Sequence, residues 1–124
     1  MNDQTRPSAA TSDDQIVLAI SSDGMGRGDD ELGRVLLRSH LHVLTEAPRR
    51  PDVLIFYNSG VRLATEGSPA LDDLRLLAEA GATILLCGTC LGHFDLKDKV
   101  AVGEISNMYT ITETMLAAAK VINL

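Results

Sequence analysis

The sequence predicts an α/β fold, a three-layer α/β/α sandwich around a mostly parallel five-stranded sheet. Two observations lead to this prediction. Short apolar runs alternate along the chain with segments whose apolar residues recur at helical spacing, which is the pattern of successive β-α units. The runs also lack the alternation of a half-exposed strand, as expected when helices cover both faces of a sheet. The chain of 124 residues is long enough for one domain.

The five apolar runs are the expected strands. They are, in order, 15–22, 51–58, 82–87, 100–105 and 120–124. The first, QIVLAISS, is rich in β-branched residues, which favour extended backbone. The residues before it, 1–14, are polar and aperiodic. We therefore expect a disordered tail over 1–14 and an ordered domain over 15–124.

Helical spacing, with capping signals at the ends, identifies three expected helices. They are 29–47, 69–80 and 107–119. The first starts with acidic residues, which suit the positive end of the helix dipole, and ends at Pro48. The second has Ser68 as its expected N-cap, Pro69 in its first position and Gly81 just past its end.

The remaining connections carry fewer signals. Ser106 and Asn107 form an N-cap signature before the third helix. We expect 61–67 to be a loop or a single turn, and 88–99 to be a turn with a short helix. The two histidines in the middle of the first helix, His40 and His42, are expected to be ordinary exposed or packed residues.

Charge and composition argue against several classes of function. The formal net charge is -6, whereas binding to nucleic acid or to an anionic membrane depends on Lys and Arg. The chain has no apolar run of about 18 residues, the length of a membrane-spanning helix, and its first residues show no apolar signal segment. With two cysteines and no export signal, we expect a protein of the reducing cytoplasm, without a structural disulfide.

Polar and glycine residues follow each of the first three strands. Since the carboxyl ends of parallel strands meet at one edge of a sheet, where ligands bind, we expect these segments to converge on a site. The glycines of the first segment suit a tight turn or an anion cradle, but the acidic residues after them would repel a phosphate. The candidate binding residues are Ser22, Asp23, Gly24, Met25, Asn58, Ser59, Gly60, Gly88, Thr89 and His93.

The two cysteines of the chain, Cys87 and Cys90, both lie in the third segment, CGTC. Cys87 ends an apolar strand, and Cys90 falls in a turn or first helical turn, where unpaired N–H groups lower the pKa of a thiol. The pair is open to several interpretations: buried packing residues, a redox pair, a sulfur carrier, or a zinc site with His93. A structural zinc needs a fourth ligand, which the sequence does not place nearby.

Four segments together resemble a known family. SSDGMGRGDDELG, FYNSGVRLATEGS, CGTCLGHFDLKDK and VGEISNMYTITET occur in the order and spacing of the DsrE-like domain of the YedF family, which is labelled as sulfurtransferase-like and linked to selenium metabolism. The resemblance covers residues 16–124. It implies the DsrEFH-like parallel α/β sandwich, homo- or hetero-oligomers, and a cysteine that carries sulfane sulfur as a persulfide, with no cofactor or metal.

The resemblance points to Cys87 and Cys90 as the catalytic residues. The position of the family's carrier at a strand end favours Cys87, whereas exposure and activation at a helix terminus favour Cys90. YedF-type proteins often have an N-terminal TusA-like domain where this chain has its polar tail, so we expect a separate TusA-like carrier as partner. The alternatives are a non-catalytic oligomeric subunit of a relay complex and a CxxC thiol-disulfide oxidoreductase.

Overall fold

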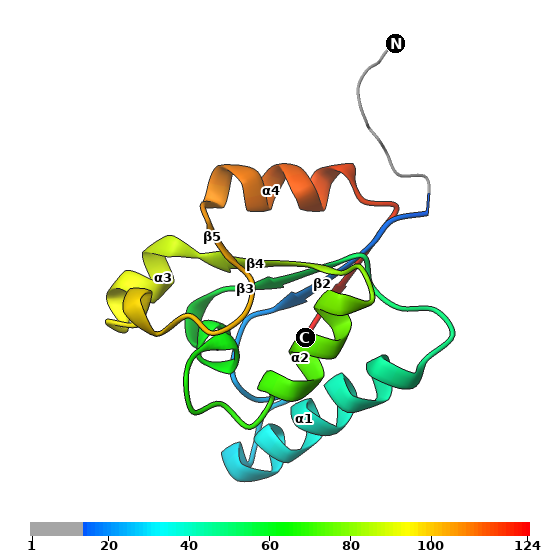
Figure 1. The fold of residues 1–124 in the computed structure, drawn as a ribbon. Helices are drawn as coiled ribbons and strands as arrows, with labels where there is room; N and C mark the ends of the chain where they lie inside the picture. Colours follow the sequence, from blue (N-terminus) through cyan, green and yellow to red (C-terminus); the bar gives the residue numbers. More distant parts are fainter. Residues whose placement is uncertain (1–13) are drawn as a thin grey trace.

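A computed structural model describes residues 14–124, which form a five-stranded parallel sheet between layers of helices (Figure 1). All but one residue of the expected tail lie outside the described residues. The sheet has the order β5-β4-β3-β2-β6, and every pair of neighbours is parallel. Its strands are β2 (Ile16–Ile20), β3 (Val53–Phe56), β4 (Thr83–Cys87), β5 (Glu104–Ser106) and β6 (Lys120–Asn123). The predicted fold class is confirmed.

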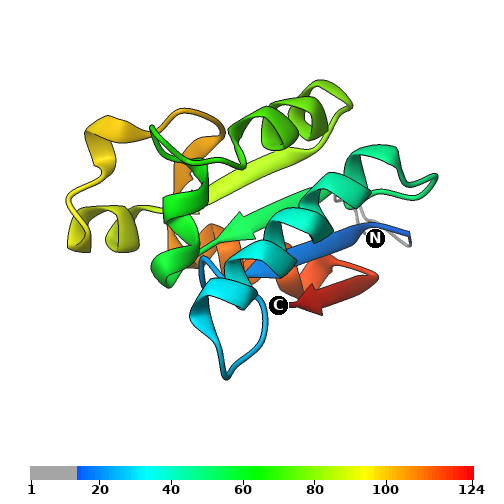
Figure 2. The ribbon, with the colours of Figure 1, turned by 90° about the horizontal axis from the view of Figure 1, so that it is seen from below.

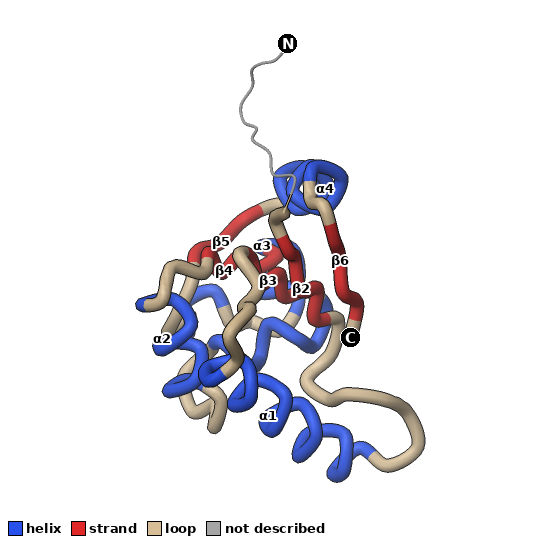
Figure 3. Tube along the Cα trace, turned by 90° about the vertical axis from the view of Figure 1, so that its right-hand side faces the viewer, coloured by secondary structure: helices blue, strands red, loops and turns tan. Residues whose placement is uncertain are grey.

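Each long helix lies on the face of the sheet that a right-handed crossover requires. The chain moves from β2 through β3 and β4 to β5 in one direction, then returns across the sheet to β6. Because such crossovers are right-handed, reversing the direction moves the connecting helix to the other face. Accordingly, α1 (Asp30–Glu46) and α2 (Leu71–Glu79) cover one face, and α4 (Met108–Ala117) covers the other (Figures 1 and 3).

Each face of the sheet has its own apolar core. On the α1 side, Leu37 and Leu41 are fully buried, and each such side chain contributes about 1.5–3 kcal/mol. On the α4 side the core is smaller, and Ile111 is the buried residue that α4 supplies. None of the helices in the described part of the chain is long and apolar enough to cross a membrane.

Most of the predicted helix ends are confirmed, but the start of α2 is not. The side chain of Asp29 caps α1, Asn107 caps α4, and Gly81 follows α2 with a φ of 112°. The prediction that Ser68 caps α2 was wrong. The Ser68 hydroxyl accepts a hydrogen bond from the Ala70 N–H, which closes a turn, so α2 begins only at Leu71.

Two connections also differ from the sequence prediction. The segment expected as a loop is part of a 3-10 helix, η1 (Asn58–Ala64), because its apolar residues pack against the core. The fourth strand begins at Glu104 and not at 100, since Gly103 turns the chain with a φ of 87°. The short helix expected after β4 is α3 (Gly88–His93), followed by η2 (Lys97–Lys99).

Candidate functional site

The carboxyl ends of β2, β3 and β4 lie side by side at one edge of the sheet. In the strand register Phe56 faces Ile20 on one side and Leu86 on the other. The loop after β2, the 3-10 helix η1 and the helix α3 therefore start next to one another (Figure 2). This is the convergence on which the sequence-based site depends.

Two hydrogen bonds join the three segments. The Asp23 N–H donates to the Ser59 hydroxyl at 3.3 Å, which links the first loop to η1. The Asn58 N–H donates to the Sγ of Cys90 at 3.0 Å, which links η1 to α3. Sulfur is a weak acceptor when protonated and a strong one when charged, so this N–H stabilises a negative sulfur more than a thiol.

The backbone of η1 is fixed by two unusual positions. Asn58 has a φ of 52°, a left-handed conformation that asparagine tolerates better than most residues, and its Oδ1 accepts the Ser59 N–H at 2.8 Å. A Cβ on Gly60 would overlap the carbonyl oxygen of Ile20 at the end of β2. Glycine at this position thus allows η1 to pack directly on the sheet, and this packing aims the Asn58 N–H at Cys90.

The two cysteines have different environments. Cys87 is the N-cap residue of α3 and is only 2% exposed, whereas Cys90 is partly exposed. Both are free thiols. The prediction that the helix start would lower the pKa of Cys90 is contradicted: burial raises the pKa, and the hydrogen bond with Cys87 raises it further, against the lowering effect of the Asn58 N–H.

An open pocket of about 300 Å³ exposes Cys90 to ligands. Its lining residues are Asn58, Thr89, Cys90, His93 and Phe94. The ring of Phe94 packs edge-on against His93, with 5.0 Å between ring centroids. Its face carries the Arg62 guanidinium 4.5 Å from the centroid, and Arg62 also lies 4.0 Å from the Asp23 carboxylate.

Arg62 and Phe94 were not among the candidate residues. Arg62 fell in the segment expected as a loop, so nothing in the pattern indicated where it would lie. A weak signal existed for Phe94, which follows Cys90 by four residues and so shares its side of a helix. Phe94 thus forms an aromatic wall of the Cys90 pocket, and Arg62 places a positive charge against the face of that ring.

Several candidate residues shape the loops and do not line this pocket. Gly24 lies against the backbone of Gly33 in α1, and the Met25 N–H donates to the Gly33 carbonyl at 2.9 Å. Ser22 bonds within its own loop, accepting the Gly24 N–H at 3.1 Å. Gly88 packs against β5, where an added Cβ would lie 3.0 Å from the Ser106 carbonyl oxygen. The glycine-rich loop is therefore a tight turn onto α1.

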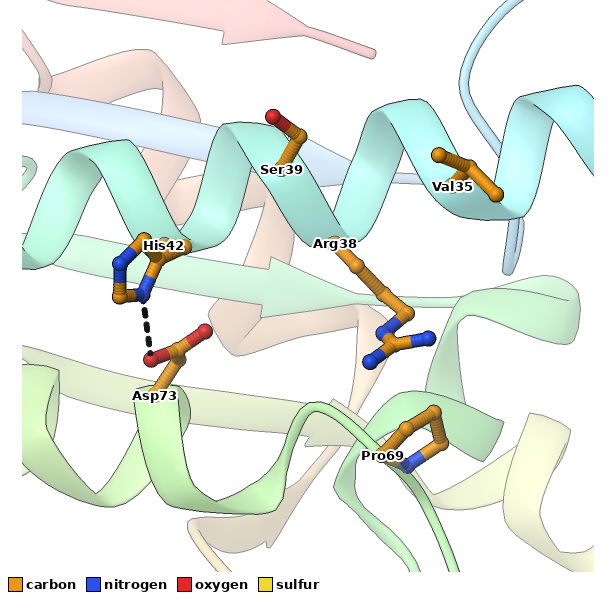
Figure 4. A pocket seen from close by; sticks show the side chains of 6 residues that line it. All are labelled: Val35, Arg38, Ser39, His42, Pro69 and Asp73. Atoms are coloured by element: carbon orange, nitrogen blue, oxygen red, sulfur yellow. Dashed lines mark hydrogen bonds and ion pairs between the residues drawn. The ribbon is translucent and has the colours of Figure 1, made fainter.

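The histidines of α1 take no part in the cysteine site. His42 is exposed and meets Asp73 of α2, with 3.2 Å between Nδ1 and Oδ1, at the wall of an open groove between the two helices (Figure 4). The hydrogen bond with Asp73 raises the pKa of His42. Within residues 14–124, no three His, Cys, Asp or Glu side chains cluster so as to hold a metal ion.

Comparison with known proteins agrees with the fold and the family resemblance. The model of the DsrE/DsrF-like family matches residues 14–124. The crystal structure of the YchN protein from E. coli is similar with a TM-score of 0.69 at 18% identity, over 90% of this chain and 99% of that one. No curated protein matches the sequence.

Two structures of proteins of unknown function are similar as well. MTH1491 from Methanobacterium thermoautotrophicum has a TM-score of 0.65 at 17% identity and covers 90% of this chain and 99% of its own. BT1422 from Bacteroides thetaiotaomicron has a TM-score of 0.61 at 14% identity, over 87% and 94% of the two chains. At these identities the three structures establish the shared fold.

Proposed function

Because this chain belongs to the DsrE/DsrF-like family, which is often associated with sulfur relay, we propose that it carries sulfane sulfur as a persulfide on Cys90. The observation that supports this most directly is the 3.0 Å hydrogen bond from the Asn58 N–H to the Cys90 Sγ, at the wall of an open pocket. Cys87, at 2% exposure, is out of reach of a donor. Cys90 is therefore the proposed carrier.

The loading step is a displacement at sulfur. The thiolate of Cys90 attacks the outer sulfur of a donor persulfide, R–S–SH. A new S–S bond forms on Cys90, the S–S bond of the donor breaks, and R–S⁻ leaves. No electron is gained or lost overall, so the step needs neither an oxidant nor an organic cofactor.

The raised pKa of Cys90 means that the resting group is a thiol at neutral pH. His93 lines the same pocket and is proposed to take the thiol proton as the donor approaches. After transfer the negative charge resides on the outer sulfur of the persulfide, and the Asn58 N–H remains available to hold the inner sulfur, the Cys90 Sγ, in position.

Cys87 is proposed to act on the loaded protein. Its thiol lies close enough to Cys90 to raise the pKa of that residue, so its thiolate could attack the Cys90 Sγ of the persulfide. This attack would form a Cys87–Cys90 disulfide and release hydrosulfide, HS⁻. A thiol reductant would then regenerate both thiols. When an acceptor protein is present, its thiolate takes the outer sulfur instead and the disulfide does not form.

The finer assignments rest on the resemblance to the YedF family. They are a TusA-like protein as donor or acceptor, selenium as a possible second cargo, and a homo-oligomer in the cytoplasm. The outer face of α4 supports an oligomer, because Tyr109 is 75% exposed and Leu116, seven residues later on the same side of the helix, is 81% exposed. Apolar residues grouped in this way commonly mark an interface between proteins.

Intact-protein mass spectrometry tests the proposal. The reduced chain is incubated with a small-molecule persulfide, alongside Cys90→Ser and Cys87→Ser as matched variants. Cys87→Ser should gain one sulfur atom that a reductant removes, Cys90→Ser should gain none, and the wild type should gain the sulfur atom first and lose it later as the Cys87–Cys90 disulfide forms. Loading of Cys90→Ser, or no loading of any form, would refute the proposal. A disulfide in the wild type with no adduct on Cys87→Ser would favour a thiol-disulfide oxidoreductase.

A further inference from the structure

A second pocket, of about 200 Å³, lies at the opposite edge of the sheet from the cysteines. Its lining comes from the start of β2, the second half of α1, the loop before β3, and β6. The lining residues are Ile16, Leu18, His40, Leu44, Arg49, Arg50, Pro51, Lys120 and Ile122. The length of β2, five residues at about 3.3 Å each, separates it from the Cys90 pocket. Nothing in the sulfur chemistry uses it.

The sheet register explains why a hollow forms there. Ile16 pairs with Lys120 and Leu18 with Ile122, so all four side chains lie on the α1 face of the β2–β6 ladder. That face is covered over β2 by α1, but β6 is an edge strand beyond the reach of both α1 and α2 (Figure 3). Ile122 is consequently 37% exposed, and its aliphatic side chain forms part of the floor.

The rim of this pocket is basic although the protein is acidic. The chain has 11 Lys and Arg residues and a net charge of -6, yet Arg49, Arg50 and Lys120 line this one pocket together with His40. None of the ion pairs within residues 14–124 involves these four side chains. Arg49 donates to the main-chain carbonyl of Asp14 at 2.8 Å, and this neutral acceptor leaves its charge unbalanced.

The acidic side chain next to the loop, Asp52, forms no ion pair within residues 14–124, and its one negative charge does not balance the three cations of the rim. The carboxylate of Asp52 accepts the Ile16 N–H at 2.8 Å, which holds it against the start of β2. Like charges gathered around an apolar floor repel one another and are stabilised when an anion binds among them. Arginine in particular presents paired donors that match a carboxylate.

We propose that this pocket binds a small aliphatic carboxylate, with the carboxylate at the Arg49, Arg50 and Lys120 rim and the hydrocarbon chain on the Ile16, Leu18 and Ile122 floor. The floor contains no aromatic side chain and no polar group other than the rim, which favours an aliphatic chain. The volume is below the about 300–1,000 Å³ of pockets for drug-sized molecules, so the ligand is short. This binding is independent of persulfide transfer on Cys90.

Hexanoate is the probe for this pocket. It is titrated into the ¹⁵N-labelled full chain at pH 7, and amide chemical shifts are followed by NMR. We expect saturable shifts at the amides of the start of β2, the 49–51 loop and β6. Hexan-1-ol, which has the same chain without the charge, should bind about tenfold more weakly, as should hexanoate to Arg50→Gln, because a charge-assisted hydrogen bond is lost.

Arg75→Gln is the matched control, since it removes the same charge from the exposed face of α2, outside the pocket. It should bind hexanoate as the wild type does. Arg50 is exposed, so its variant should fold, and the dispersion of its spectrum verifies this. The proposal is overturned by shifts that do not saturate, by equal affinity for hexanoate and hexan-1-ol, or by equal affinity of Arg50→Gln and Arg75→Gln.

Discussion

Replacing Gly60 with alanine tests how the site is built. The added Cβ would overlap the carbonyl oxygen of Ile20, and it would lie 3.1 Å from the carbonyl carbon and 3.4 Å from the Ser22 nitrogen. All three are backbone atoms at the end of a central strand, so they cannot move aside as a flexible side chain does. Helix η1 must shift instead, and overpacking of this kind costs about 1–3 kcal/mol.

Gly60→Ala should lower both the stability of the protein and the reactivity of Cys90. For a domain of this size the melting temperature should fall by about 4–12 °C, at about 4 °C per kcal/mol. A shift of η1 also draws the Asn58 N–H away from the Cys90 Sγ. Because that hydrogen bond lowers the pKa of Cys90, its loss should raise the pKa further and slow alkylation at a fixed pH.

Thermal and urea unfolding followed by circular dichroism measure the loss of stability, and iodoacetamide kinetics on the folded protein measure the change at Cys90. Gly92→Ala in α3 is the matched control. Its Cβ would lie 3.4 Å from the flexible end of Lys97, and alanine is favoured over glycine inside a helix by about 0.5–1 kcal/mol. The reasoning is refuted if Gly60→Ala unfolds within about 0.5 kcal/mol of the wild type and its Cys90 reacts at the wild-type rate.

Three further predictions follow from single contacts. The alkylation rate of Cys90 should still rise above pH 9.0, the ordinary pKa of a thiol, because the pKa of Cys90 is raised. Cys87→Ala should lower the pKa of Cys90 and speed its alkylation. A rate that levels off below pH 9.0 would contradict the raised pKa. The hydrogen bond with Asp73 raises the pKa of His42 above its ordinary 6.5. The stabilisation of the folded protein by this bond should therefore be complete below about pH 6.5 and disappear as the pH rises through the raised pKa. His42→Gln should abolish this pH dependence in urea titrations, and an unchanged dependence would contradict the prediction. Asn107→Ala should lower the free energy of unfolding by about 1 kcal/mol in the same assay, because it removes the side chain that caps α4. An unchanged urea midpoint would show that this cap does not stabilise the protein.

The sequence predicted the parts of this fold that depend on local pattern. Strand and helix periodicity located the elements, and Asn107 and Gly81 marked real helix ends because caps act within a few residues. The convergence of the strand-end segments followed from the parallel sheet alone. The order of the strands could not be predicted in this way, because β6 pairs with β2 only through a long crossover that no local signal encodes.

The details of the site depend on contacts between distant segments, which a single sequence does not reveal. η1 is ordered because Gly60 approaches the end of β2, 40 residues earlier. The direction of the Cys90 pKa was mispredicted because burial and the neighbouring Cys87, which raise the pKa, outweigh the Asn58 N–H, which lowers it. Arg62 lies near the site because it stacks on Phe94, 32 residues later in the chain.

The central claim is that Cys90, and not Cys87, carries the sulfur in the unmutated protein. The most direct measurement loads the wild-type chain with a persulfide donor, blocks it with iodoacetamide at an early time, before the disulfide forms, and locates the extra sulfur by fragmenting the peptide that holds both cysteines. Cleavage between Gly88 and Thr89 separates the two. We predict the additional sulfur on the fragment that contains Cys90, whereas finding it on the fragment that contains Cys87 would contradict the account.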